Sequence, residues 1–135
     1  MYRPVEQLVL TAKAFADPTR VRILQALRER ELCVCELCDA LKVTQSTLST
    51  HLQVVRSAGL VDSRKHGKWM YYAIAPAARR RIESLFQMFA GSAKEDPALG
   101  RDAKRLNQRL SLRENGICCV GFGTAGGKAR SGKCC

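Results

Sequence analysis

The chain has 135 residues, of which 46% are hydrophobic, so it has the size of one domain and enough apolar material for a core. It carries 23 Lys and Arg against 12 Asp and Glu, a formal net charge of +11 at pH 7. No apolar run approaches the roughly 20 residues that span a bilayer, and the first residues lack the apolar segment of a secretory signal. These features exclude a wholly disordered chain and favour a cytoplasmic protein, away from the membrane, with an anionic partner.

Apolar residues at helical spacing predict four helices in the first half of the chain. The first covers about residues 5–16, and Asp17-Pro18 begins the second, because Asp is a favourable N-cap and Pro fits the first helical position. A short third helix is expected from about Leu32 to Leu41, and a fourth from Gln45 or Ser46 to Ser57. The tight connection between these last two helices predicts a helix–turn–helix.

Residues 60–74 lose the helical period and are rich in β-branched and aromatic side chains, around a polar stretch that contains Gly67. This pattern is typical of a β-hairpin with a basic tip. A further helix is expected from Pro76 to about Phe89, and another after Pro97 that ends near Asn115-Gly116. The expected fold is therefore mainly α with a β-hairpin wing (α+β), a winged helix–turn–helix.

The second helix of such a motif enters the major groove, and here it offers short hydrogen-bonding side chains to base edges or phosphates. Between Lys42 and Arg81 there are eight basic residues against one acid, so most of the positive excess lies where DNA would bind. We therefore expect double-stranded DNA as a partner. The predicted DNA-binding residues are Gln45, Ser46, Thr47, Ser49, Thr50, His51, Arg64, Lys65 and Lys68.

His51 and three of the eight basic residues can be interpreted without DNA contact. His51 either touches a phosphate or packs at the helix surface, and the triplet Arg79-Arg80-Arg81 is expected to be a solvated face. Neither histidine lies in a recognisable catalytic motif with an activated nucleophile, so the sequence does not indicate an enzyme.

Three of the seven cysteines, Cys33, Cys35 and Cys38, lie within six residues at the start of the third predicted helix. In an ideal helix Cys35 and Cys38 share a face and Cys33 does not, so a shared ion requires the first turn to distort. Three thiolates without another donor suit a pyramidal centre such as As(III) or Sb(III), whereas zinc or cadmium normally takes a fourth ligand. We expect the ion and DNA to favour different conformations, so that each weakens binding of the other.

Other interpretations of the cysteines remain open. Helical cysteines are often small core residues, although Cys-x-Cys-x-x-Cys is dense for that role, and the spacing of Cys35 and Cys38 also allows a redox switch. The alternative class is a cytosolic thiol protein, a metalloid carrier or a redox sensor, in which DNA contact is incidental. The remaining cysteines form either an accessory metalloid site or exposed thiols, and they are Cys118, Cys119, Cys134 and Cys135.

Three segments resemble the ArsR–SmtB family of metal-responsive repressors: Phe15–Leu24, Glu31–Cys38 and Gln45–Leu52. The Cys-Val-Cys-x-x-Cys form is similar to the arsenic-responsive branch, which controls arsenic resistance operons. The resemblance implies a homodimeric repressor on two-fold operator DNA, which binds DNA without a cofactor. It also implies that As(III) or Sb(III) acts as the inducer by binding Cys33, Cys35 and Cys38.

A repressor that senses Cd, Pb or Zn is the alternative within the family. The cadmium- and lead-responsive relatives add N-terminal cysteines, whereas no cysteine precedes Cys33 here. The zinc site needs Asp and His on the helix after the wing, and residues 76–89 contain neither. With the resemblance, the expected organisation is a winged-helix DNA-binding and dimerisation domain (residues 1–91), an additional C-terminal helix (92–115) and a flexible Gly/Cys-rich tail (116–135).

Overall fold

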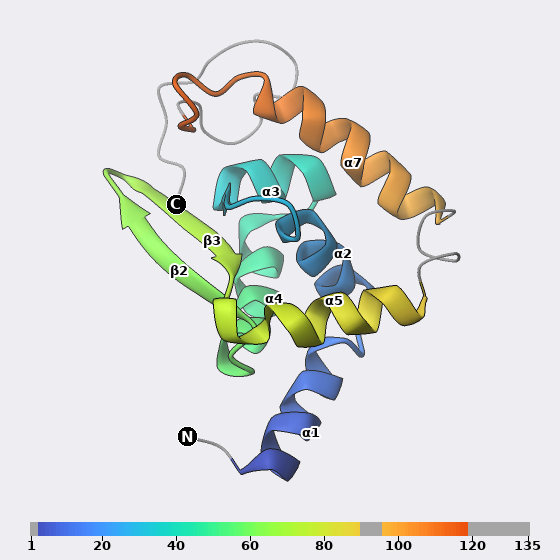
Figure 1. The fold of residues 1–135 in the computed structure, drawn as a ribbon. Coiled ribbons are helices and arrows are strands. Elements are labelled where there is room, and N and C mark those ends of the chain that lie inside the picture. Colours follow the sequence, from blue (N-terminus) through green and yellow to red (C-terminus); the bar gives the residue numbers. More distant parts are fainter. Residues whose placement is uncertain (1–2, 90–95, 119–135) are drawn as a thin grey trace.

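Helices make up most of the structure, and a small antiparallel sheet stands at one side of them (Figure 1). The computed structural model describes residues 3–89 and 96–118. The helices in these ranges are α1 (Pro4–Ala14), α2 (Pro18–Leu27), α3 (Val34–Leu41), α4 (Gln45–Ser57), α5 (Arg79–Met88) and α7 (Pro97–Leu110), with a 3-10 turn η1 (Pro76–Ala78) before α5. The strands are β1 (Leu32–Cys33), β2 (Val61–His66) and β3 (Trp69–Ile74).

The helix start predicted from the capping residue Asp17 is confirmed, and the structure adds a second cap, at the start of α4, that the sequence pattern did not indicate. The side chain of Asp17 accepts a hydrogen bond from the backbone N–H of Arg20 at 3.1 Å and caps α2. Thr44 Oγ1 accepts from the N–H of Thr47 at 3.3 Å and caps α4. Each cap satisfies one of the N–H groups that a helix leaves without an internal partner.

The third helix begins two residues later than predicted. Leu32 and Cys33 form the strand β1, which pairs with Tyr72 and Tyr71 of β3, and Cys33 is the N-cap of α3 with extended backbone angles. This strand has only two residues, and its conformation depends on a partner strand some 40 residues further along the chain. Local helical spacing therefore could not reveal it.

The wing is the β2–β3 hairpin, closed by the two residues Gly67 and Lys68 between the paired His66 and Trp69. Gly67 has φ of +60°, a backbone conformation that glycine adopts without steric cost and that a two-residue hairpin loop requires. The sheet order is β1-β3-β2, so β3 is the central strand and joins the wing to the residues that precede α3.

The main core lies between α2, α3, α4 and the sheet. Leu24 and Leu27 of α2, Leu37 and Leu41 of α3, and Leu48 of α4 are all almost fully buried within it. Among the helices that the structure describes, none combines the length and apolar character that crossing a membrane requires.

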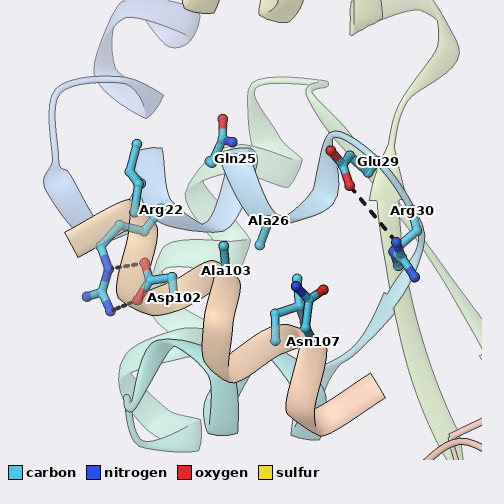
Figure 2. Close-up of a pocket in the computed structure, with 10 residues that line it drawn as sticks. Arg22, Gln25, Ala26, Glu29, Arg30, Asp102, Ala103 and Asn107 are labelled. Carbon is cyan, nitrogen blue, oxygen red and sulfur yellow. Dashed lines mark hydrogen bonds and ion pairs between the residues drawn. The ribbon is translucent and has the colours of Figure 1, made fainter. Parts of the chain in front are cut away.

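Helix α7 packs against α3 and α2 and is held there by ion pairs. Figure 2 shows Arg22 of α2 joined to Asp102 of α7, with the Nε–Oδ2 and Nη2–Oδ1 distances at 2.7 and 2.8 Å. Arg109 of α7 donates to Asp39 of α3 at 2.7 Å. The last predicted helix therefore exists, but it ends at Leu110 rather than near Asn115, where positive φ angles at Asn115 and Gly116 form a turn.

Candidate DNA-binding surface and thiol site

The outer face of α4 carries the polar side chains that the sequence assigns to base contacts. Leu48, Leu52 and Val55 bury the opposite face of the helix in the core. The predicted base-contacting residues on the outer face are all exposed, and they are Gln45, Ser46, Thr47, Ser49 and Thr50. The burial of one face thus fixes α4 to the domain and leaves the polar face available to a groove of DNA.

His51 is half-buried, and its ring lies against α2. The Nδ1 atom is 3.2 Å from Arg20 Nη1 and 3.8 Å from the carboxylate of Asp17. Burial raises the pKa of Asp17, but the backbone N–H of Arg20 and the charge of His51 outweigh burial and hold that pKa below its ordinary value of 3.8. These contacts tie the middle of α4 to the start of α2.

The wing presents its predicted basic residues to solvent, and Arg64 has a partner within the protein. Lys65 and Lys68 are exposed at and beside the tip, and Lys68 Nζ lies 5.1 Å from the ring centre of Trp69. The guanidinium of Arg64 donates to Glu31 at 2.7 Å and lies 5.0 Å from the ring centre of Tyr71. Arg64 therefore connects the outer strand of the wing to the residues just before β1.

Three buried sulfur atoms come together beneath the wing, in a group that we call the thiol cluster: Cys33, Cys35 and Cys118. The Sγ atoms of Cys33 and Cys35 are 2.9 Å apart, those of Cys35 and Cys118 are 3.2 Å apart, and all three lie within 4.8 Å of one another. Each of these residues has a relative exposure of 1% or less. Trp69 and Tyr71 of β3 pack against the cluster.

The sulfurs of Cys33 and Cys35 lie close together without any distortion of α3, because Cys33 is in the strand before the helix rather than in its first turn. Cys38 is one turn further along α3 and packs in the main core with Leu37 and Leu41. From the sequence, Cys118 is expected only as a member of an accessory site or as an exposed thiol. Its place beside Cys35 depends on a contact across 83 residues, which no local pattern encodes. Cys119, Cys134 and Cys135 lie outside the described residues.

Several side chains around the thiol cluster fix its position. The backbone N–H of Cys118 donates to the hydroxyl of Tyr71 at 2.9 Å, and burial raises the pKa of this tyrosine. Glu36 Oε1 accepts from the N–H of Cys33 at 2.8 Å, and Arg113 pairs with the same carboxylate. Sequence analysis did not single out Tyr71, Glu36 or Arg113. Only the position of Glu36, three residues after the N-cap Cys33, signals a capping role.

A helix–turn–helix with an exposed polar recognition helix and a basic wing defines a winged-helix DNA-binding regulator. Residues 17–63 match the model of the family described as "Bacterial regulatory protein, arsR family". The arsenic resistance transcriptional regulator ArsR1 of Pseudomonas putida is 35% identical over 109 residues, which are 80% of this chain and 84% of that protein. The chain belongs to the arsR family, and it is a DNA-binding transcriptional repressor rather than an enzyme.

Two further comparisons agree with this assignment. The arsenical resistance operon repressor of Escherichia coli (strain K12) is 48% identical over 65 residues, covering 47% of this chain and 56% of that protein. The homodimeric winged helix-turn-helix DNA-binding domain Mb0332 from Mycobacterium bovis has a TM-score of 0.59 at 33% identity, covering 67% of this chain and 84% of that one. The family resemblance and the winged-helix fold expected from the sequence are confirmed.

Proposed function

We propose that the chain represses an arsenic resistance operon as a homodimer, and that As(III) or Sb(III) releases it from its operator by binding cysteine thiolates. The observation that carries this proposal is the buried group of three sulfurs within 4.8 Å of one another. The names of the similar proteins in Pseudomonas putida and Escherichia coli, both regulators of arsenic or arsenical resistance, support it.

The donor set favours a trivalent metalloid over zinc or cadmium. With metal–sulfur bonds near 2.3 Å, three thiolates on one centre lie roughly 3.4 to 3.8 Å apart, so the sulfurs need to move by less than about 1.5 Å. The group contains no histidine or carboxylate, and the nearby carboxylate of Glu36 is already engaged by Arg113. A pyramidal As(III) or Sb(III) centre needs only three donors, whereas a tetrahedral zinc site needs four.

On the DNA side, we assign the recognition surface to the exposed face of α4 and the wing, and we place the protein in the cytoplasm. The proposed contacts are Gln45, Ser46, Thr47, Ser49 and Thr50 at the groove, with His51, Arg64, Lys65 and Lys68 toward the phosphates. DNA binding needs no cofactor, because every one of these groups belongs to the protein.

Exposed apolar side chains on α1 and α5 support the homodimer. Val5 and Leu8 of α1 are 71% and 69% exposed, and Met88 of α5 and Phe89 just after it are 72% and 62% exposed. Large apolar side chains exposed to this extent on two helices are typical of surfaces that another protein covers. The similar domain from Mycobacterium bovis is homodimeric, which favours a second copy of this chain as that protein.

The position of Cys33 explains how the ligand and DNA influence each other. Cys33 ends β1, which pairs with the wing strand β3, and it directly precedes α3, which packs against the recognition helix α4. A shift at Cys33 therefore moves both DNA-contacting elements. Because coupling between two binding sites is reciprocal, metalloid binding and DNA binding weaken each other.

The test is a DNA-binding titration by fluorescence anisotropy under reducing conditions, with a labelled duplex that the protein has selected from a random-sequence pool. Arsenite is expected to release wild-type protein, while the double variant Cys33→Ser/Cys35→Ser stays bound to the same duplex. If arsenite leaves the wild-type complex intact, or if zinc or cadmium releases it and arsenite does not, the proposal is wrong.

The 2.9 Å contact between Cys33 and Cys35 favours one second candidate, a redox-sensing repressor. Hydrogen peroxide would oxidise the two thiols to a disulfide, and their two protons and two electrons would reduce it to two molecules of water. In the same titration, release by peroxide in the absence of arsenite, reversed by a dithiol reductant, would select this candidate.

A further inference from the structure

We propose that Cys118, rather than Cys38, supplies the third thiolate of the metalloid site. The site would then be built from three separate parts of the chain: the end of β1, the first turn of α3 and the segment that follows α7. This inference rests on the proposed function, because it names the ligands that hold the same inducer.

The distances favour Cys118 directly. Its sulfur is 3.2 Å from that of Cys35, and it belongs with Cys33 and Cys35 to the group whose members all lie within 4.8 Å. Cys38 does not belong to that group and is buried in the main core, where its exposure is 5%. Because Cys38 belongs to the buried cluster of the main core, moving its sulfur toward the other two would disturb close packing, which is costly.

The segment that carries Cys118 is fixed by contacts on both sides. Glu114 and Ile117 exchange two backbone hydrogen bonds of 3.0 and 2.9 Å around the turn at Gly116. The N–H of Cys118 then donates to the Tyr71 hydroxyl at 2.9 Å, and Arg113 pairs with Glu36 at 2.6 Å. The thiol is thus held in place before any ligand arrives, so binding does not have to order this segment.

A cation lies at the edge of the site. Arg109 Nη2 is 4.0 Å from the sulfur of Cys118, and its side chain is fully buried. Arg109 also donates to Asp39, so it joins the sulfur of Cys118 to α3. Arsenous acid would exchange its three hydroxyl groups for three sulfurs: three As–O and three S–H bonds break, three As–S bonds form, and three molecules of water leave.

The composite site also assigns a role to the segment after α7. Cys118 donates to Tyr71, and the Tyr71 ring lies beneath Arg64 of the wing. Drawing Cys118 toward Cys33 and Cys35 would therefore pull on Tyr71, which is itself a residue of the wing strand β3. In this arrangement the C-terminal segment takes part in sensing as well as in packing.

The experiment compares Cys118→Ser with Cys38→Ser in the full chain, with Cys119→Ser as the control for loss of a neighbouring thiol. X-ray absorption at the arsenic edge counts the sulfurs bound to arsenite, and anisotropy measures release from the selected duplex. For Cys118→Ser we expect the count to fall from three to two. We also expect release to need about 10- to 100-fold more arsenite, because one arm of a chelate is lost. Cys38→Ser and Cys119→Ser should keep three sulfurs and normal release.

The outcomes separate this inference from the proposed function. Three sulfurs in Cys118→Ser together with two in Cys38→Ser would overturn the assignment, while arsenite would still be the inducer. Normal behaviour of both single variants would also overturn it, because no single third ligand would then exist. Failure of arsenite to bind or release the wild-type protein would instead refute the proposed function. Circular dichroism of each variant confirms that it is folded.

Discussion

Arg113 donates from Nε and Nη2 to the two carboxylate oxygens of Glu36, both at 2.6 Å. Glu36 is fully buried in the first turn of α3, and the hydrogen bond to it raises the pKa of Arg113. The same carboxylate accepts from the N–H of Cys33. One ion pair therefore fastens the segment after α7 to the part of the protein that holds two of the three clustered sulfurs.

Removing the cation of this pair should destabilise the fold strongly. We expect Arg113→Met to lower the free energy of unfolding by about 3–5 kcal/mol, because it leaves the buried carboxylate of Glu36 without its counter-charge. Urea unfolding followed by circular dichroism measures the change. Arg101→Met, at an exposed position of α7, is the matched control and should change stability by less than about 0.5 kcal/mol. Equal effects of the two variants would contradict a structural role for the pair.

The N-cap of α2 predicts a dependence of stability on pH. The pKa of Asp17 is below its ordinary value of 3.8 in the folded state, so the charged form stabilises the fold above that pH. The contribution is lost as pH falls through the folded-state pKa. Asp17→Asn keeps a capping side chain and removes the charge, so wild type should exceed it in stability at pH 7, with the gap closing below about pH 4. Asp17→Ala should cost about 1 kcal/mol at pH 7. A gap between wild type and Asp17→Asn that stays constant from pH 7 to pH 2 would rule out this assignment.

The basic residues of the wing should contribute charge rather than sequence selectivity. Lys65→Ala is expected to weaken binding to selected and random duplexes alike and to reduce the slope of log K against log salt by about 1, as expected for the loss of one phosphate contact. Binding titrations at several salt concentrations measure that slope. Lys104→Ala removes an exposed charge from α7, outside the proposed DNA-binding surface, and should leave the slope unchanged. A selective loss of affinity for the chosen duplex alone would show that Lys65 reads bases instead.

The apolar surface of α1 should hold two copies of the chain together. Leu8→Glu places a charge where the side chain is 69% exposed in a single copy, so it should dissociate the dimer while the fold remains intact. Sedimentation velocity measures the state of assembly. Gln108→Glu on α7 adds the same charge at another exposed position and should remain dimeric. A dimeric Leu8→Glu protein would place the interface elsewhere.

The elements that the sequence predicts well are those encoded by neighbouring residues. The helix–turn–helix follows from apolar spacing and from the cap Asp17, and the wing follows from the Gly67 turn. The features that it does not predict depend on contacts between distant segments. Cys33 is extended because Tyr71 pairs with it, and Cys118 reaches Cys35 only because α7 packs on α3.

The thiol site therefore divides into two parts of different predictability. Cys33 and Cys35 are visible as a dense local motif at the start of a helix, and the expected chemistry of a soft ion follows from that density. The identity of the third clustered sulfur depends on the tertiary structure. Spacing on an ideal helix points to Cys38, but Cys33 lies in a strand, and the group of sulfurs that forms there contains Cys118 in place of Cys38.

The central claim is that the thiol cluster and the DNA-binding surface are energetically coupled. The most direct measurement is the affinity of arsenite for the free protein and for the protein saturated with its selected duplex, by calorimetric titration under reducing conditions. Reciprocity predicts that DNA weakens arsenite binding by the same factor by which arsenite weakens DNA binding, typically about 5- to 150-fold. Equal arsenite affinity in the free and DNA-bound protein would contradict the claim, even if the three sulfurs bind arsenic.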